Sequence, residues 1–170
     1  MSKRILLLPI MVFILSACEK TKDPGIDIPK PIDKAIVSTL WNTVTENYLY
    51  KNSDGSIAYE QKTVYDEPKK TTIQYKFQED HRVWRIDKVT HTPSYYGSWE
   101  LTRENKKDFV IITWGANKID KYEVTSYTNT IMNWHIVDTQ GSDLQYTKDG
   151  QVYTADSREG TIELHCPCRD

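Results

Sequence analysis

The sequence predicts an all-β protein: an antiparallel up-and-down β-barrel of about eight to ten strands, preceded by a short helix. Three observations support this prediction. Apolar and polar residues alternate with a period of two over most of the chain, turn-forming residues separate these stretches, and only one short segment has helical spacing. A chain of 170 residues with 38% apolar and 27% charged residues can form one globular domain. Closing the sheet into a barrel removes its exposed edges.

The N-terminal residues 1–17 have the composition of a signal peptide. Lys3 and Arg4 supply a basic start, and Ile5–Leu15 is an almost wholly apolar segment. A helix that spans a bilayer needs roughly 20 apolar residues, so this segment is too short to span comfortably. Its length is typical of the apolar region of a secretory signal.

The segment Leu15–Cys18, with sequence Leu-Ser-Ala-Cys, resembles the bacterial lipobox. The resemblance implies cleavage before Cys18, acylation of its thiol and new amine with chains such as palmitate, and membrane attachment through these chains. Each buried CH₂ contributes about 0.8 kcal/mol, so several chains anchor a protein stably. Glu19 is not the aspartate that commonly retains lipoproteins in the inner membrane, which favours a lipid anchor in the outer membrane, facing the periplasm or the surface. The alternative is an ordinary signal peptide followed by an incidental cysteine.

Residues 18–33 form the predicted lipidated cysteine and an extended tether, because this segment combines charges with three prolines, one glycine and little apolar mass. The barrel domain is then expected over residues 34–168. Ile32, Ile36 and Leu40 follow at helical spacing, and Asp33 is suited to a helix N-terminus, so a short helix is expected over residues 33–40.

The rest of the chain alternates as strands do. In Thr72–Phe77, the residues Ile73, Tyr75 and Phe77 share one face, whereas Phe109–Trp114 is apolar on both faces and is typical of a central strand. The same alternation groups Trp84 with Ile86, Trp99 with Leu101, Tyr122 with Val124, Met132 with Trp134 and Ile136, and Ile162 with Leu164 and Cys166. Turn formers separate these stretches at residues 52–55, 105–108, 115–117, 128–130, 140–143 and 148–150.

Several of these stretches together resemble the lipocalin-like lipoproteins of Gram-negative envelopes. The resemblance rests on Tyr75–Asp80, Gly97–Leu101, Phe109–Ile112, Lys121–Val124 and Ile131–Trp134 in that order, and covers roughly residues 36–165. It implies a β-barrel that binds a hydrophobic small molecule.

Aromatic side chains are the candidate pocket residues, because small barrels either fill with side chains or hold one small ligand. The chain has 5 Trp, 11 Tyr and 3 Phe. The same residues would equally serve as ordinary core packing. The candidate ligand-pocket residues are Trp41, Tyr75, Phe77, Trp84, Trp99, Tyr122 and Trp134.

The C-terminal segment His165–Cys168, with sequence His-Cys-Pro-Cys, leaves three alternatives open. In an oxidising envelope, a disulfide between Cys166 and Cys168 is favoured, although the small ring would be strained. Free or intermolecular thiols are the second alternative. Zinc binding is the third, but structural zinc usually needs four ligands and no fourth is apparent, so no metal site is predicted.

The sequence excludes some functions and leaves others open. A net charge of −2 gives no basic surplus for nucleic-acid binding. The sequence contains no nucleophile motif, no phosphate-binding motif and no paired-histidine motif. We therefore expect neither catalysis nor a cofactor. The preferred hypothesis is an envelope lipoprotein whose barrel binds an apolar or amphipathic small molecule. The alternatives are a protein-binding or scaffolding lipoprotein, favoured by the many tyrosines, and a metal or redox role for His165–Cys168.

Overall fold

The computed structural model describes residues 30–65, 73–87, 89–115, 118–138 and 142–167. Over these residues the chain forms mainly antiparallel strands with one short α-helix and one 3₁₀ turn. The elements are α1 (Ile32–Val37), β1 (Leu40–Lys51), β2 (Ile57–Val64), β3 (Ile73–Phe77), β4 (Arg82–Asp87), β5 (Pro93–Glu104), β6 (Lys107–Trp114), β7 (Lys118–Tyr127), β8 (Ile131–Asp138), η1 (Ser142–Leu144), β9 (Gln145–Lys148), β10 (Gln151–Thr154) and β11 (Ser157–His165).

Eight of these strands close into a barrel, which confirms the predicted fold class. The strands from β3 to β8 each pair with the next strand along the chain, β8 then pairs with β11, and β1 joins β11 to β3. The whole ring is antiparallel. Strand β2 and the β9–β10 hairpin lie outside the ring.

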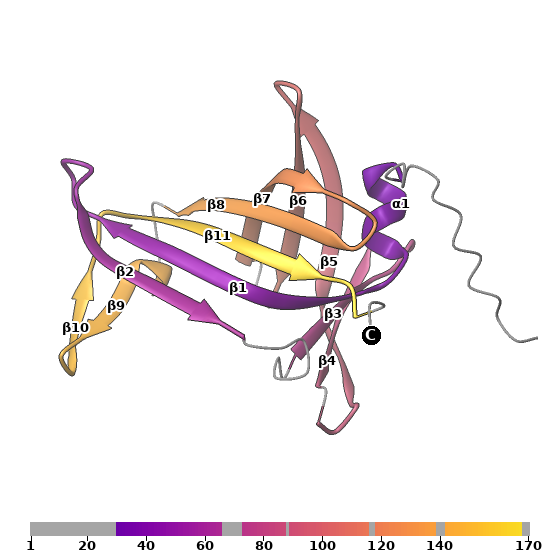
Figure 1. Ribbon diagram of the computed structural model, residues 1–170, viewed down its shortest axis with the longest axis horizontal. Coiled ribbons are helices and arrows are strands. Elements are labelled where there is room, and N and C mark those ends of the chain that lie inside the picture. The colour runs from indigo at the N-terminus through magenta and orange to yellow at the C-terminus, as the bar shows by residue number, and fades with distance from the viewer. Residues whose placement is uncertain (1–29, 66–72, 88, 116–117, 139–141, 168–170) are drawn as a thin grey trace, which may run out of the picture.

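One edge of β1 is divided between two partners. Residues Leu40–Asn42 pair with β3, whereas Thr45–Lys51 pair with β2. The other edge of β1 pairs with β11 from Asn42 to Lys51. Figure 1 shows the antiparallel strands β1 and β11 lying side by side between the α1 end of the molecule and the end that carries the β9–β10 hairpin. The barrel wall is therefore complete near α1 and divides farther along β1.

The barrel end next to α1 is closed by apolar side chains. Ile36 of α1 and Trp41 of β1 are fully buried, and the Trp41 indole N–H donates to the carbonyl of Ile36 (2.9 Å). The Phe77 ring meets Trp99 edge-on, with the centroids 5.5 Å apart. The buried core consists of Ile36, Trp41, Phe77, Val83, Trp99, Val110, Ile112, Met132, Trp134, Ile162 and Leu164.

A row of tyrosines attaches the β9–β10 hairpin to the far end of β1 and β2. The Tyr146 ring of β9 stacks on Tyr59 of β2, with centroids 5.0 Å apart, and lies at the same distance from Tyr50 of β1. Tyr153 of β10 stacks on the Tyr146 ring. These ring contacts thus hold the hairpin against the end of the sheet.

The structure refines the expectations for the N-terminal part of the domain. The helix occupies Ile32–Val37, and Leu40 already begins β1.

Strands β1, β2, β9 and β10 are absent from the predicted alternating segments. Their sequences alternate poorly because β1 is half-buried on both faces and the other three are largely exposed. Within the described residues, no helix is long and apolar enough to cross a membrane.

The packing of the closed end predicts unequal effects of two matching tryptophan substitutions. Trp41→Phe leaves the buried Ile36 carbonyl without its donor and should cost about 1–3 kcal/mol. Trp84→Phe loses a hydrogen bond to the side chain of Gln78 on the half-exposed outer face, and should cost less than about 1 kcal/mol. Urea unfolding of both variants measures the difference. Equal losses in the free energy of unfolding would contradict the assigned packing.

Candidate functional site

A cavity of about 120 Å³ lies inside the barrel, on the side of the core away from α1. An apolar cavity of roughly 150 Å³ in another protein binds benzene, so this space is slightly smaller than one that holds a single ring. The lining residues are Thr43, Glu46, Tyr48, Tyr75, Tyr96, Ile112, Tyr122, Trp134, Ile162 and Leu164.

A β-bulge in β1 turns Glu46 and Tyr48 into the barrel. Trp41 and Thr43 face inward at the start of the strand, so strict alternation would next bring residues 45 and 47 inward. The register shifts between Thr43 and Thr45, and the extra residue reverses the alternation. Glu46 and Tyr48 line the cavity as a result.

A second bulge has the same effect in β5. Val83 pairs with Gly97 and Trp84 pairs with Tyr95, which leaves Tyr96 as the extra residue. Tyr96 turns inward to the cavity, while Tyr95 is 59% exposed on the outer face. The Tyr96 ring stacks on Trp114, with centroids 5.6 Å apart.

Regular alternation supplies the other aromatic walls. Tyr122 of β7 stacks on Trp134 of β8 with ring centroids 4.8 Å apart, and Tyr75 of β3 lies 5.8 Å from the Tyr96 ring. Trp134 is only 5% exposed, and its indole N–H has no hydrogen-bond partner among the described residues. Trp134 thus contributes its ring to the cavity wall, while its N–H is buried without a partner among the described residues.

Glu46 places a carboxylate in this aromatic space. Burial raises its pKa above the ordinary value, and this effect exceeds the opposing ones of a hydrogen bond from Tyr65 and of the Arg158 charge. The Tyr65 hydroxyl donates to Glu46 Oε2 at 3.4 Å, which is a long hydrogen bond. The carboxylate is thus poorly solvated and weakly paired.

The cavity tyrosines are neutral hydrogen-bonding groups at physiological pH. Burial is the main cause that raises the pKa of Tyr96 to about 12, and it raises the pKa values of Tyr48, Tyr75 and Tyr122 as well. Asp120 raises the pKa of Tyr122 further. Within the described part of the chain, the four hydroxyls form no hydrogen bond with another residue. They can donate to or accept from a ligand.

Two arginines stand against cavity rings without lining the cavity. The Arg158 guanidinium lies 4.5 Å from the centre of the Tyr48 ring, and its Nε donates to Asp138 Oδ2 (2.9 Å). The Arg85 guanidinium lies 5.1 Å from the centre of the Tyr96 ring. Both distances are within the range of cation–π attraction.

The structure distributes the predicted pocket residues among three environments. Tyr75, Tyr122 and Trp134 line the cavity. Trp41, Phe77 and Trp99 lie in the closed apolar end. Trp84 lies on the outer face, where its ring meets Tyr95 edge-on.

Seven of the ten cavity residues were not predicted, and three of these, Glu46, Tyr48 and Tyr96, are the residues that distinguish the cavity from the core. All three face inward because of bulges, which reverse the alternation on which the prediction depended. Gly97 carried a usable signal, because a glycine inside a strand often marks a bulge. The bulge in β1 has no comparable marker in the sequence.

The C-terminal cluster is only partly described. Cys166 Sγ lies 2.9 Å from the hydroxyl oxygen of Thr39, and His165 Nε2 lies 2.6 Å from Glu163 Oε1. Cys168 and the predicted lipidation site Cys18 are outside the described residues. In the part of the chain that the structure describes, no group of three histidine, cysteine or acidic residues could hold a metal.

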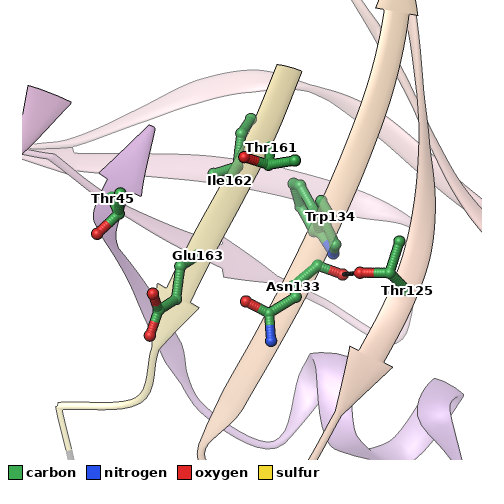
Figure 2. Close-up of a pocket in the computed structure, with 7 residues that line it drawn as sticks. All are labelled: Thr45, Thr125, Asn133, Trp134, Thr161, Ile162 and Glu163. Atoms are coloured by element: carbon green, nitrogen blue, oxygen red, sulfur yellow. Dashed lines mark hydrogen bonds between the residues drawn. The ribbon is translucent and has the colours of Figure 1, made fainter. Parts of the chain in front are cut away.

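The outer wall carries a separate shallow groove of about 230 Å³. Figure 2 shows its side chains spread over β1, β7, β8 and β11, with the Thr125 hydroxyl directed at the Asn133 carbonyl (3.2 Å). Its polar groups belong to an outer face of the sheet, and Trp134 and Ile162 separate it from the interior cavity. The interior cavity, with its buried and incompletely paired groups, is therefore the candidate site.

Comparisons of the chain with protein-family models, with curated proteins and with solved structures find no match.

The burial of Glu46 predicts how stability depends on pH. A carboxyl with a raised pKa favours folding while it is protonated, and this contribution is lost as the pH rises through the folded-state pKa. Glu46→Gln keeps an acceptor for Tyr65 and removes the charge. The variant should be more stable than the unchanged protein at pH 7, with the advantage disappearing below the ordinary glutamate pKa of 4.5.

Chemical denaturation at a series of pH values measures this effect. Glu60→Gln is the matched control, because Glu60 is exposed on β2. A Glu46→Gln variant that is less stable at pH 7 than at pH 4, relative to the unchanged protein, would contradict the assigned environment.

Proposed function

We propose that this protein is an outer-membrane lipoprotein whose lipocalin-like barrel binds a small apolar or amphipathic molecule without chemical conversion. The observation that carries the proposal is the cavity inside the barrel, walled by four tyrosines and one tryptophan. Binding sites are typically concave and mainly apolar, with a few polar groups that orient the ligand. The cavity is concave and lined mainly by aromatic and aliphatic residues, with tyrosine hydroxyls, Thr43 and Glu46 as polar groups that can orient a ligand.

The dimensions of the cavity restrict the ligand. Its volume of about 120 Å³ is below the range of roughly 300–1,000 Å³ that is common for sites that enclose drug-sized ligands. The proposed ligand is therefore a molecule of about one ring, or the end group of a longer molecule. Displacement of water from the aromatic walls supplies most of the binding free energy.

The proposal contains no catalytic step because of the residues that line the cavity. Histidine, cysteine and lysine are absent from the described lining, and Glu46 is its single carboxylate. General acid–base and nucleophilic catalysis usually combine two or more such groups.

The proposed location rests on the N-terminal sequence. The lipobox-like segment Leu15–Cys18 and the proline-containing tether would hold the barrel near the outer membrane through acyl chains. Labelling with radioactive palmitate tests this part, with Cys18→Ala as the variant that should lose the label.

A cavity-filling substitution tests ligand binding directly. Ile112 lines the cavity, and its neighbour Ile111 faces the outer wall of the same strand. Phenethyl alcohol, a neutral molecule with one ring, should bind the unchanged protein in calorimetric titration. Ile112→Phe should weaken binding at least about tenfold, or about 1.4 kcal/mol, because the added ring occupies the cavity.

Ile111→Phe is the matched control and should bind the probe as the unchanged protein does. Circular dichroism checks that both variants keep the fold, since overpacking typically costs about 1–3 kcal/mol. Equal binding by all three proteins would place the probe outside the cavity and contradict the proposal.

A second candidate function, protein binding, is favoured by the β9–β10 hairpin. Val152 is 66% exposed and Tyr153 is 41% exposed at the end of the molecule opposite α1. Exposed tyrosines are common at recognition surfaces. Crosslinking in intact envelopes, compared between the unchanged protein and a Val152→Ser/Tyr153→Ser variant, tests this candidate, which predicts a stoichiometric partner that the variant loses.

A further inference from the structure

One carboxyl group belongs to the cavity lining itself. Of the ten residues that line it, Glu46 is the one with an acidic or basic side chain other than tyrosine, and the four tyrosines remain protonated at neutral pH. A ligand that enters the cavity therefore meets a carboxylate and the faces or edges of five aromatic rings.

The Glu46 carboxylate retains unused capacity to accept hydrogen bonds. An ionised carboxylate offers about four acceptor positions, and its hydrogen bond in the described structure is the long one from Tyr65. Arg158, the nearest compensating charge, is bound to Asp138 through two of its N–H groups. Glu46 is thus available as a counter-ion to a ligand.

The surrounding rings already attract cations from the protein. Arg158 lies against the Tyr48 ring and Arg85 against the Tyr96 ring. No cation of the described chain lies over the ring faces of Tyr122 and Trp134, whereas Tyr75 has Arg85 as its cross-strand neighbour. Cation–π attraction is worth about 0.5–1 kcal/mol at exposed sites and about 2 kcal/mol or more when the cation is desolvated.

We propose that the cavity selects a small organic cation, a protonated amine or a quaternary ammonium group on an apolar body of about one ring. Glu46 is its counter-ion, and Tyr75, Tyr122 and Trp134 form the walls around it. This inference deepens the proposed function and rests on it. Such a cation adds what the cavity lining lacks, a positive charge beside the half-buried Glu46 carboxyl, and a protonated amine also supplies N–H donors.

Arg85 supports the opposite ligand chemistry. Its guanidinium forms no ion pair with an acidic side chain among the described residues, and an anionic ligand could approach it from the cavity. However, Arg85 does not line the cavity, and an anion there would lie beside Glu46. The geometry therefore favours a cation.

Three probes of nearly equal shape test the charge preference: phenethylamine as the cation, phenethyl alcohol as the neutral molecule and phenylacetate as the anion. Each is titrated calorimetrically into the full chain at pH 7. The amine should bind at least about tenfold more tightly than the alcohol, and phenylacetate should bind most weakly.

Variants at Glu46 assign the preference to this residue. Glu46→Gln should remove the advantage of the amine over the alcohol, while Glu46→Asp should restore part of the advantage because it keeps the charge. Glu60→Gln, on the exposed part of β2, should leave all three affinities unchanged.

The outcomes separate this inference from the proposed function. If the alcohol binds in the cavity and the amine binds no more tightly, or phenylacetate binds best, the cation inference is wrong and the carrier function stands. If none of the three probes binds, the proposed function fails together with the inference. An amine preference that survives in Glu46→Gln would also overturn the assignment of Glu46.

Discussion

The divided edge of β1 is the constraint on which the rest of the structure depends. Three residue pairs, Leu40–Asn42 with Gln74–Lys76, join β1 to β3 and close the barrel. A hydrogen bond between the side chains of Gln74 and Asn42 (2.9 Å) reinforces this short contact. Beyond Asn42 the same edge turns to β2, and the bulge at the point of change brings Glu46 inward. The closure of the barrel and the inward position of the half-buried Glu46 carboxyl are therefore set in the same part of β1.

This arrangement gives the barrel two chemically different halves. Near α1 the ring is complete, and apolar groups such as Trp41 and Phe77 fill it. Farther along, the wall divides. The interior there contains tyrosines and a carboxyl group, and two arginines lie against tyrosine rings. Burying such polar groups costs free energy unless they have hydrogen-bond partners such as water or a ligand. A barrel of eight strands has room for side chains or for one small ligand, and in this one the end near α1 is filled with side chains while the far half contains the cavity.

The sequence predicted the fold class because period-two alternation and turn residues are local signals. Strands such as β3 and β8 were recognisable from Tyr75–Phe77 and Met132–Ile136 alone. The inward set was harder to predict, since it depends on bulges and on pairing partners that are distant in sequence. Trp84 and Trp99 illustrate this limit: both alternate correctly, but Trp84 faces outward and Trp99 inward. A search for aromatic residues does not find Glu46, although its carboxyl group is the proposed counter-ion of the ligand.

The most direct test of the account is a native mass spectrum of the full chain, isolated from the envelope of cells that produce it. The account predicts an added organic mass, of about one ring or carried on a longer molecule, that leaves on denaturation and is missing from Ile112→Phe. An added mass that persists equally in Ile112→Phe would place the ligand outside the cavity. If the protein carries no such mass and also fails to bind the one-ring probes, the central claim, that the interior cavity of the barrel is a ligand site, is contradicted.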